Sequence, residues 1–74
     1  MRMTAELHTM SVIRLGDAWT IVAQGRRWGR FLYRVDAEEA ALRLAARGRQ
    51  DGRSVEVLIQ GPWGEMRPLE AANG

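Results

Sequence analysis

The segment at residues 36–52, DAEEAALRLAARGRQDG, constrains the fold more than any other part of this 74-residue chain. Its small and apolar residues recur at helical spacing and form one stripe: Ala37, Ala40, Ala41, Leu44 and Gly48. Asp36 and Glu39 have the spacing of a capping box, which predicts a helix that begins after Asp36 and ends near Gln50. A lone amphipathic helix needs a sheet on which to bury its stripe, and small side chains let the two lie close together.

Alternating apolar residues predict three strands before this helix. We expect them over residues 11–15, 19–24 and 30–35. GDA at 16–18 is a turn signal, and the glycines of GRRWG at 25–29 bound a second chain reversal. A meander of three antiparallel strands is the simplest arrangement of these segments.

Two further strands are expected after the helix. Residues 53–60, RSVEVLIQ, alternate in the pattern of a strand. GPWG indicates a turn before a short last strand over 65–69, which Pro68 marks as an edge or an end. The order β-β-β-α-β-β predicts an α+β fold, an antiparallel sheet with one helix packed on one face.

A chain of this length is expected to form one domain, which we place at residues 11–69. Residues 1–10 show no clear period and are expected to be a loose N-terminal arm, and residues 70–74 a C-terminal tail. So short a chain buries only about 60% of the surface that its unfolded form exposes. A partner subunit would therefore add to a thin core.

The residue types that enzymes and metal sites need are scarce. The chain has no cysteine, which excludes disulfides, thiolate metal sites and cysteine nucleophiles. Its one histidine, His8, has no second ligand at metal-binding spacing and no serine that it serves as a base. Glu38 and Glu39 are adjacent on the expected helix, so they point in different directions. We therefore expect no enzymatic activity, no metal, no cofactor and no small-molecule substrate.

No part of the sequence predicts a membrane protein. No apolar run approaches the roughly 20 residues that a membrane-spanning helix needs. The first ten residues also lack the apolar core of a secretory signal. We expect a cytoplasmic protein with no membrane partner.

Positive charge is concentrated in the first half of the chain. All eleven basic residues are arginine. Residues 14–34 hold five arginines against the single acid Asp17, a net of +4, whereas residues 35–74 hold five arginines against seven acids, a net of −2. The stretch QGRRWGR at 24–30 lies in the basic part, which makes the first hairpins the candidate binding region.

Alternation over residues 30–35 sharpens this expectation. It places Arg30, Leu32 and Arg34 on the face opposite Phe31, and therefore on the open face of the sheet if Phe31 faces the helix. Arg14 joins them if its strand pairs in the matching register. The full set of expected binding residues is Arg14, Arg26, Arg27, Trp28, Arg30, Leu32, Arg34 and Trp63.

Two functions are compatible with this surface. The first is a non-enzymatic binding or assembly module whose open sheet face, with Val22 and Leu32, meets a protein partner or a second copy. Trp63 would add an exposed aromatic contact, unless it folds over the sheet edge. The alternative is nucleic-acid binding through the basic hairpin at 26–34, with Trp28 at the turn stacking on a base. In a third interpretation, the arginines only keep exposed strands from pairing.

AWTIVAQG, DAEEAALRLA and VEVLIQGPWGEM together resemble a family of small bacterial domains of unknown function. That family has a W-x-V strand, a T-x-x-E-A helix start, and V-x-V with G-x-x-G before a last strand. The resemblance covers residues 12–67 and implies the fold without an activity. Asp36 replaces the family's threonine cap, and Arg34 replaces its phenylalanine, which leaves the register of the third strand open. The first half is also similar, in topology, to the N-terminal DNA-binding domain of phage integrases.

Overall fold

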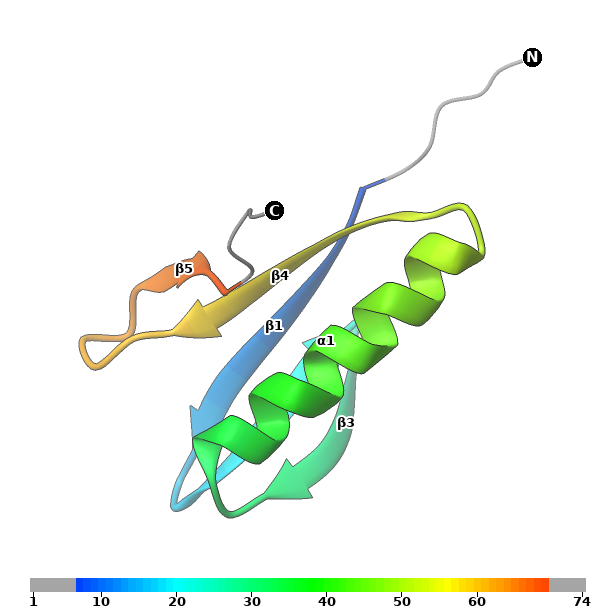
Figure 1. Cartoon of the computed structure of the whole chain (residues 1–74). Helices are drawn as coiled ribbons and strands as arrows, with labels where there is room; N and C mark the ends of the chain where they lie inside the picture. The colour runs from blue at the N-terminus through cyan, green and yellow to red at the C-terminus, as the bar shows by residue number, and fades with distance from the viewer. Residues whose placement is uncertain (1–6, 70–74) are drawn as a thin grey trace.

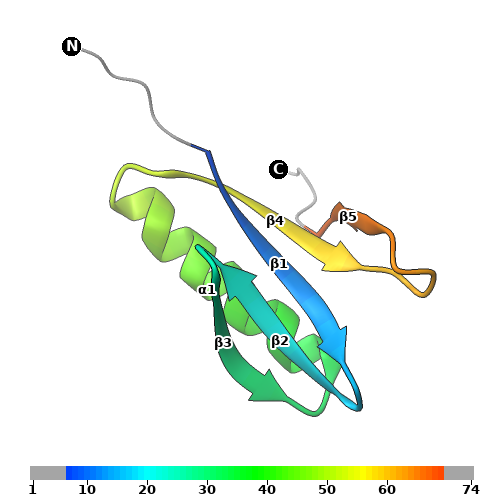
Figure 2. The same cartoon turned by 180° about the vertical axis from the view of Figure 1, so that it is seen from behind.

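The structure, a computed structural model, describes residues 7–69. Its elements in chain order are β1 (Leu7–Leu15), β2 (Ala18–Ala23), β3 (Arg26–Phe31), α1 (Arg34–Gln50), β4 (Ser54–Gln60) and β5 (Met66–Pro68). The strands form one sheet in the order β3-β2-β1-β4-β5. The helix α1 lies diagonally across one face of this sheet (Figures 1 and 2). The predicted α+β fold with one helix packed on a sheet is therefore confirmed.

The sheet is mixed, so the prediction of a fully antiparallel sheet is wrong at one place. β1 pairs with β2 antiparallel on one side and with β4 parallel on the other. The cause is the helix, which follows β3 and returns the chain to the end of the sheet where β1 begins. β4 then starts beside β1 and runs in the same direction, as strands joined by a helical crossover do.

β1 is longer than expected and begins at Leu7. Residues 7–10 pair with β4, from Leu7 opposite Ser54 to Met10 opposite Val57. The expected loose arm through residue 10 is therefore wrong for these four residues, because all four pair with β4 and Met10 also pairs with β2. Residues 1–6 of that arm and the expected tail at 70–74 lie outside the described residues.

The third strand also differs from the prediction. The chain reverses at Gln24 and Gly25, which have φ values of 55° and 75°, and β3 starts directly at Arg26. Two central residues with positive φ suit the twist of a tight two-residue hairpin. GRRWG is therefore mostly strand, and the strand expected over 30–35 ends at Phe31.

A β-bulge interrupts the pairing of β2 with β3. Trp19 is opposite Phe31 and Ile21 is opposite Trp28, so that Thr20 faces two residues of β3 instead of one. Gly29, with φ at 79°, is one of these two, and its carbonyl oxygen accepts a 2.7 Å hydrogen bond from Thr20 Oγ1. The extra residue places Trp28 and Phe31 on the same side of the sheet although they are three positions apart.

α1 ends at Gln50 as predicted, but it begins at Arg34, before the expected cap at Asp36. Tyr33 is the N-cap residue, in an extended conformation, and no side chain caps the helix. The Arg34 guanidinium contacts Glu38 at 2.6 Å, which supports an additional turn at this end. Asp36 lies within the first turn, where its negative charge interacts favourably with the positive end of the helix dipole.

The core lies between α1 and the sheet. Its largest fully buried side chains are Val12, Ile21 and Val57, from three adjacent strands. On the helix, the buried residues are Ala37, Ala41, Ala45 and Gly48, which confirms the small-residue stripe with Ala45 added to it. Within residues 7–69, no element covers the opposite face of the sheet (Figure 2).

Candidate binding surfaces

The structure divides the eight expected binding residues among three surfaces. Arg27 and Arg30 lie on the open face of the sheet, and Arg26 and Trp28 lie on the face that carries the helix. The other four lie at the end of the sheet where α1 begins: Arg14, Leu32, Arg34 and Trp63. Arg30 lies on the open face, opposite in direction to Phe31, as expected. The expected single basic face with Leu32 and Arg34 is wrong, because β3 ends at Phe31 and α1 begins at Arg34.

The strand register defines the open face. One row across the sheet contains Arg27, Val22, Ser11, Leu58 and Pro68. The next row contains the pairs Thr20–Ile13 and Gln60–Met66, where Ile13 and Gln60 directly follow the paired residues Val12 and Ile59. The middle of both rows is apolar or neutral, since it consists of Val22, Ser11 and Leu58 in the first row and Thr20, Ile13 and Gln60 in the second.

Charged side chains lie only toward the edges of these rows. Arg27 and Arg30 are on β3, and Glu56 is on β4, one position before the first row. The centres of protein interfaces are depleted in charged residues and their rims are polar. The open face of this sheet has that distribution.

A hollow of about 360 Å³ lies at the β3 side of the open face. It is lined by Leu15, Ala18, Trp19, Thr20, Arg27, Gly29 and Arg30. Thr20 is only 5% exposed although no element covers this face, because the bulged β3 closes over it. Arg30 is 3.5 Å from Asp17 at the rim, a solvent-exposed pair of little energetic value. The hollow is therefore a partly apolar depression beside the guanidinium groups of Arg27 and Arg30.

A second surface lies between α1 and β3, on the helix side. Two adjacent hollows of about 240 and 320 Å³ share the same three lining residues, Trp28, Leu44 and Arg47. The Trp28 side chain is 41% exposed, and its Nε1 donates a hydrogen bond to the carbonyl oxygen of Ala23 at 3.3 Å. The indole is therefore held in place with part of its surface open to solvent.

The cations around Trp28 come from both halves of the chain. Arg43 and Arg47 are one turn apart on α1, and Arg26 lies two residues before Trp28 on the same face of β3. None of the three has an acidic partner within residues 7–69. We name the residues Arg26, Trp28, Arg43, Leu44 and Arg47 the α1–β3 groove.

The arginines at the helix N-terminal end are already engaged. The Arg34 guanidinium lies 5.9 Å from the centroid of the Trp19 ring and also contacts Glu38. Arg14 Nε donates to the carbonyl oxygen of Gly16 at 3.1 Å. These two residues border an open hollow of about 430 Å³ with the 60–64 loop, but their contacts are within the chain.

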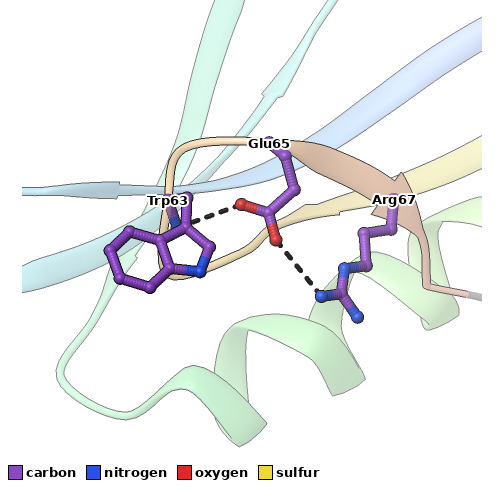
Figure 3. Close-up of polar contacts among 3 residues, drawn as sticks. All are labelled: Trp63, Glu65 and Arg67. Carbon is purple, nitrogen blue, oxygen red and sulfur yellow. Dashed lines mark hydrogen bonds and ion pairs between the residues drawn. The ribbon is translucent and has the colours of Figure 1, made fainter.

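Trp63 projects from the β4–β5 loop and is 90% exposed, so the expectation that it folds over the sheet edge is wrong. Glu65 orders this loop (Figure 3), because its carboxylate accepts the Trp63 backbone N–H at 3.0 Å and Arg67 Nη2 at 3.2 Å. Hydrogen bonds from the backbone N–H of Glu65 itself, from Arg67 and from the Trp63 N–H together lower the pKa of Glu65. The loop therefore holds an exposed indole on an ordered turn.

Comparison with family models, with curated proteins and with solved structures finds no match for this chain. Among the residues that the structure describes, no helix is long and apolar enough to cross a membrane. No group of three or more His, Cys, Asp or Glu side chains in that part of the chain is placed to hold a metal ion.

Sequence reasoning missed two sets of surface residues. Ile13, Leu58 and Met66 belong to the open face, and continuing the alternation of β1 and β4 onto their second faces would have indicated the first two. Arg43 and Arg47 belong to the groove, and their spacing of four on a helix was a signal that they share one face. That this face meets Trp28 depends on the two-residue turn at Gln24 and Gly25, which places Trp28 opposite the buried Ile21.

Proposed function

We propose that this domain is a non-enzymatic assembly module that associates with a second copy of itself through the open face of the sheet. The observation that carries the proposal is the uncovered face itself, with an uncharged centre and charges only toward its edges. Leaving Val22, Ile13 and Leu58 in water loses stabilisation that burial against another surface would recover. A domain with so small a core gains in stability from such a partner.

A second copy is favoured over an unrelated protein because the face is complementary to itself. A two-fold axis parallel to β1 would place β5 of one copy over β3 of the other. Met66, which is 39% exposed, would then lie over the hollow beside Arg27 and Arg30. Glu56 is on β4, which would lie over β2 of the second copy, next to the strand that carries Arg27 and Arg30. Its carboxylate would supply an opposite charge to these two arginines at the rim of the interface.

The size of the face is compatible with a small specific interface. Five strands at a spacing of about 4.8 Å and six residues at about 3.3 Å give a face of roughly 500 Å² per copy. Two copies would therefore bury on the order of 1,000 Å², the lower limit for a specific interface. We accordingly expect a dimer in the micromolar range rather than an obligate one.

Sedimentation equilibrium over a range of protein concentrations tests the proposal. Leu58→Arg places a charge at the centre of the face and should make the protein monomeric. Leu42→Arg, on the outer face of α1 where the leucine is 37% exposed, is the matched control and should leave association unchanged. A wild-type chain that is monomeric at all concentrations, or equal effects of the two variants, would overturn the proposal.

We also propose that the fold is that of the small bacterial domains of unknown function that the sequence resembles. The resemblance agrees in the order of elements but implies no activity. On the sequence pattern alone, we propose a bacterial, cytoplasmic protein.

A further inference from the structure

The α1–β3 groove lies on the other side of the sheet from the proposed dimer face, and it has a chemistry of its own. We propose that this groove binds single-stranded nucleic acid, with a base on each side of Trp28 and the intervening phosphate at Arg47. The proposal does not depend on self-association, because none of the five groove residues belongs to the two rows of the open face.

The order of apolar and cationic groups along the groove matches their order along a nucleic-acid strand. Trp28, Leu44 and Arg47 stand between two hollows. The hollow toward the helix C-terminus has an apolar lining that includes Met10, Ala23 and Val55, and the other includes Phe31 and Ala40. A single strand alternates flat apolar bases with charged phosphates, so two bases in the hollows would leave a phosphate beside the central arginine. The half-exposed indole offers a surface on which a base stacks.

The charge of the groove has the required sign. Arg26, Arg43 and Arg47 have no acidic partner within the described residues, so an incoming anion displaces no ion pair. Asp51 is the one acid among the residues that line the two hollows, and it already contacts Arg53 at 3.6 Å. Guanidinium groups bind phosphate through paired N–H donors, which an ammonium group does not offer in the same geometry.

A single strand fits better than a duplex or an acidic peptide. Bases in a duplex are stacked on each other, so their flat faces cannot enter side hollows, whereas a single strand exposes them. An acidic peptide would satisfy the arginines but would place flexible carboxylate side chains next to an indole and apolar walls. The shape of the groove therefore favours a nucleic-acid single strand over an acidic peptide, and competition between the two for the groove can be measured.

Fluorescence anisotropy with labelled ten-nucleotide oligo-dT and oligo-rU, at low and near-physiological salt, tests the proposal. Trp28→Leu should weaken binding roughly 5- to 100-fold through lost stacking. Its matched control is Trp63→Leu, which removes an exposed indole elsewhere. Arg43→Gln with Arg47→Gln should lower the salt dependence of log K by about 1.4, the value for two lost phosphate contacts on a single strand.

The control for charge is Arg27→Gln with Arg30→Gln, which removes the same charge from the opposite face of the sheet. Thermal unfolding of each variant confirms that the domain is folded. The proposal is overturned if both double variants weaken binding equally, or if polyglutamate of the same length competes as well as oligo-dT. It is also overturned if no binding is seen at low salt. Retained binding in the Arg27/Arg30 variant with loss in the Arg43/Arg47 variant supports it.

Discussion

Val22 of β2 and Leu58 of β4 lie in one row of the open sheet face, on either side of Ser11 of β1. The helix covers neither of them, because both belong to the strand positions that face away from α1. Two half-buried apolar side chains separated only by a small hydroxyl form a continuous surface that water covers in the monomer. Self-association is the simplest way to bury it.

Self-association predicts that thermal stability depends on concentration, because a dimer interface stabilises only the folded state. The Tm of the wild-type chain should rise by several degrees between low- and high-micromolar protein. Val22→Thr keeps the shape of the side chain but replaces one methyl group with a hydroxyl, so it should flatten this dependence with little change in Tm at the lowest concentration. Differential scanning calorimetry at four concentrations measures both effects, and a concentration-independent wild-type Tm would contradict them.

A pair of opposite charges at Met66 tests the geometry of the dimer. In the proposed arrangement Met66 faces Arg27 and Arg30 of the second copy, so Met66→Arg should weaken association by repulsion. Met66→Glu should weaken it much less, or strengthen it, because the new carboxylate meets two guanidinium groups. Sedimentation velocity at matched concentrations compares the variants. Equal dissociation constants for the two charges would exclude this arrangement.

The hydrogen bond from Thr20 to the Gly29 carbonyl should stabilise the bulged edge of the sheet. Thr20→Val removes the donor while keeping a β-branched side chain, and it leaves a poorly solvated carbonyl, so we expect a loss of about 1 kcal/mol. Thr9→Val is the control, since Thr9 is exposed and this change should stay within about 0.5 kcal/mol. Urea unfolding at low protein concentration gives both values.

Gly25 and Gly29 both have positive φ values, but an added Cβ would clash only at Gly29. Alanine at these two positions therefore distinguishes backbone strain from steric clash. A Cβ at Gly29 would lie 2.6 Å from Phe31 Cε2, whereas a Cβ at Gly25 has no atom within 4 Å. Both alanine variants incur about 1–2 kcal/mol of backbone strain at positive φ. Gly29→Ala should cost a further 1–3 kcal/mol or so, because the Phe31 ring has to shift. Chemical denaturation measures the free energy of unfolding of both variants. Equal losses of this free energy in the two variants would contradict the assigned bulge.

The Glu65 turn should be sensitive to acid. Its pKa is lowered in the folded state, so the turn's stabilisation is complete above the unfolded-state value near 4.5 and is lost as pH falls through the folded value. A carboxyl-detected NMR titration should give a midpoint below 4.5, and the Trp63 amide shift should follow the same curve. Arg67→Gln should raise the midpoint only in part, because the backbone N–H bonds remain. A midpoint at or above 4.5 would show that the turn is not formed.

The parts of the fold that the sequence predicted are those set by local patterns. The helix end at Gln50, the strand with Val57 and Ile59 on one face, and the short strand ending at Pro68 follow from periodicity and from breaker residues. The order of the elements was also correct, since each element had its own signal.

The parts that were not predictable depend on contacts between distant residues. The parallel pairing of β4 with β1 is decided by the direction in which the helix returns the chain, and residues 7–9 of β1 pair with β4 but not with β2. The bulge at Gly29 depends on how β3 pairs with β2, where Thr20 is opposite two residues of β3. It places Arg30 on the open face and Phe31 on the helix side, while β3 ends at Phe31 and α1 begins at Arg34. The predicted binding residues therefore lie on three surfaces.

The most direct test of self-association is an isotope-filtered NOE experiment on a mixture of labelled and unlabelled protein. In this sample only contacts between two copies give signals. The proposed dimer predicts intermolecular NOEs from the Met66 methyl group to protons of Ala18 and Thr20, and from the Ile13 methyl groups to residues across the interface. Intermolecular NOEs confined to the helix side, or none at a concentration where sedimentation shows a dimer, would contradict the open sheet face as the assembly surface.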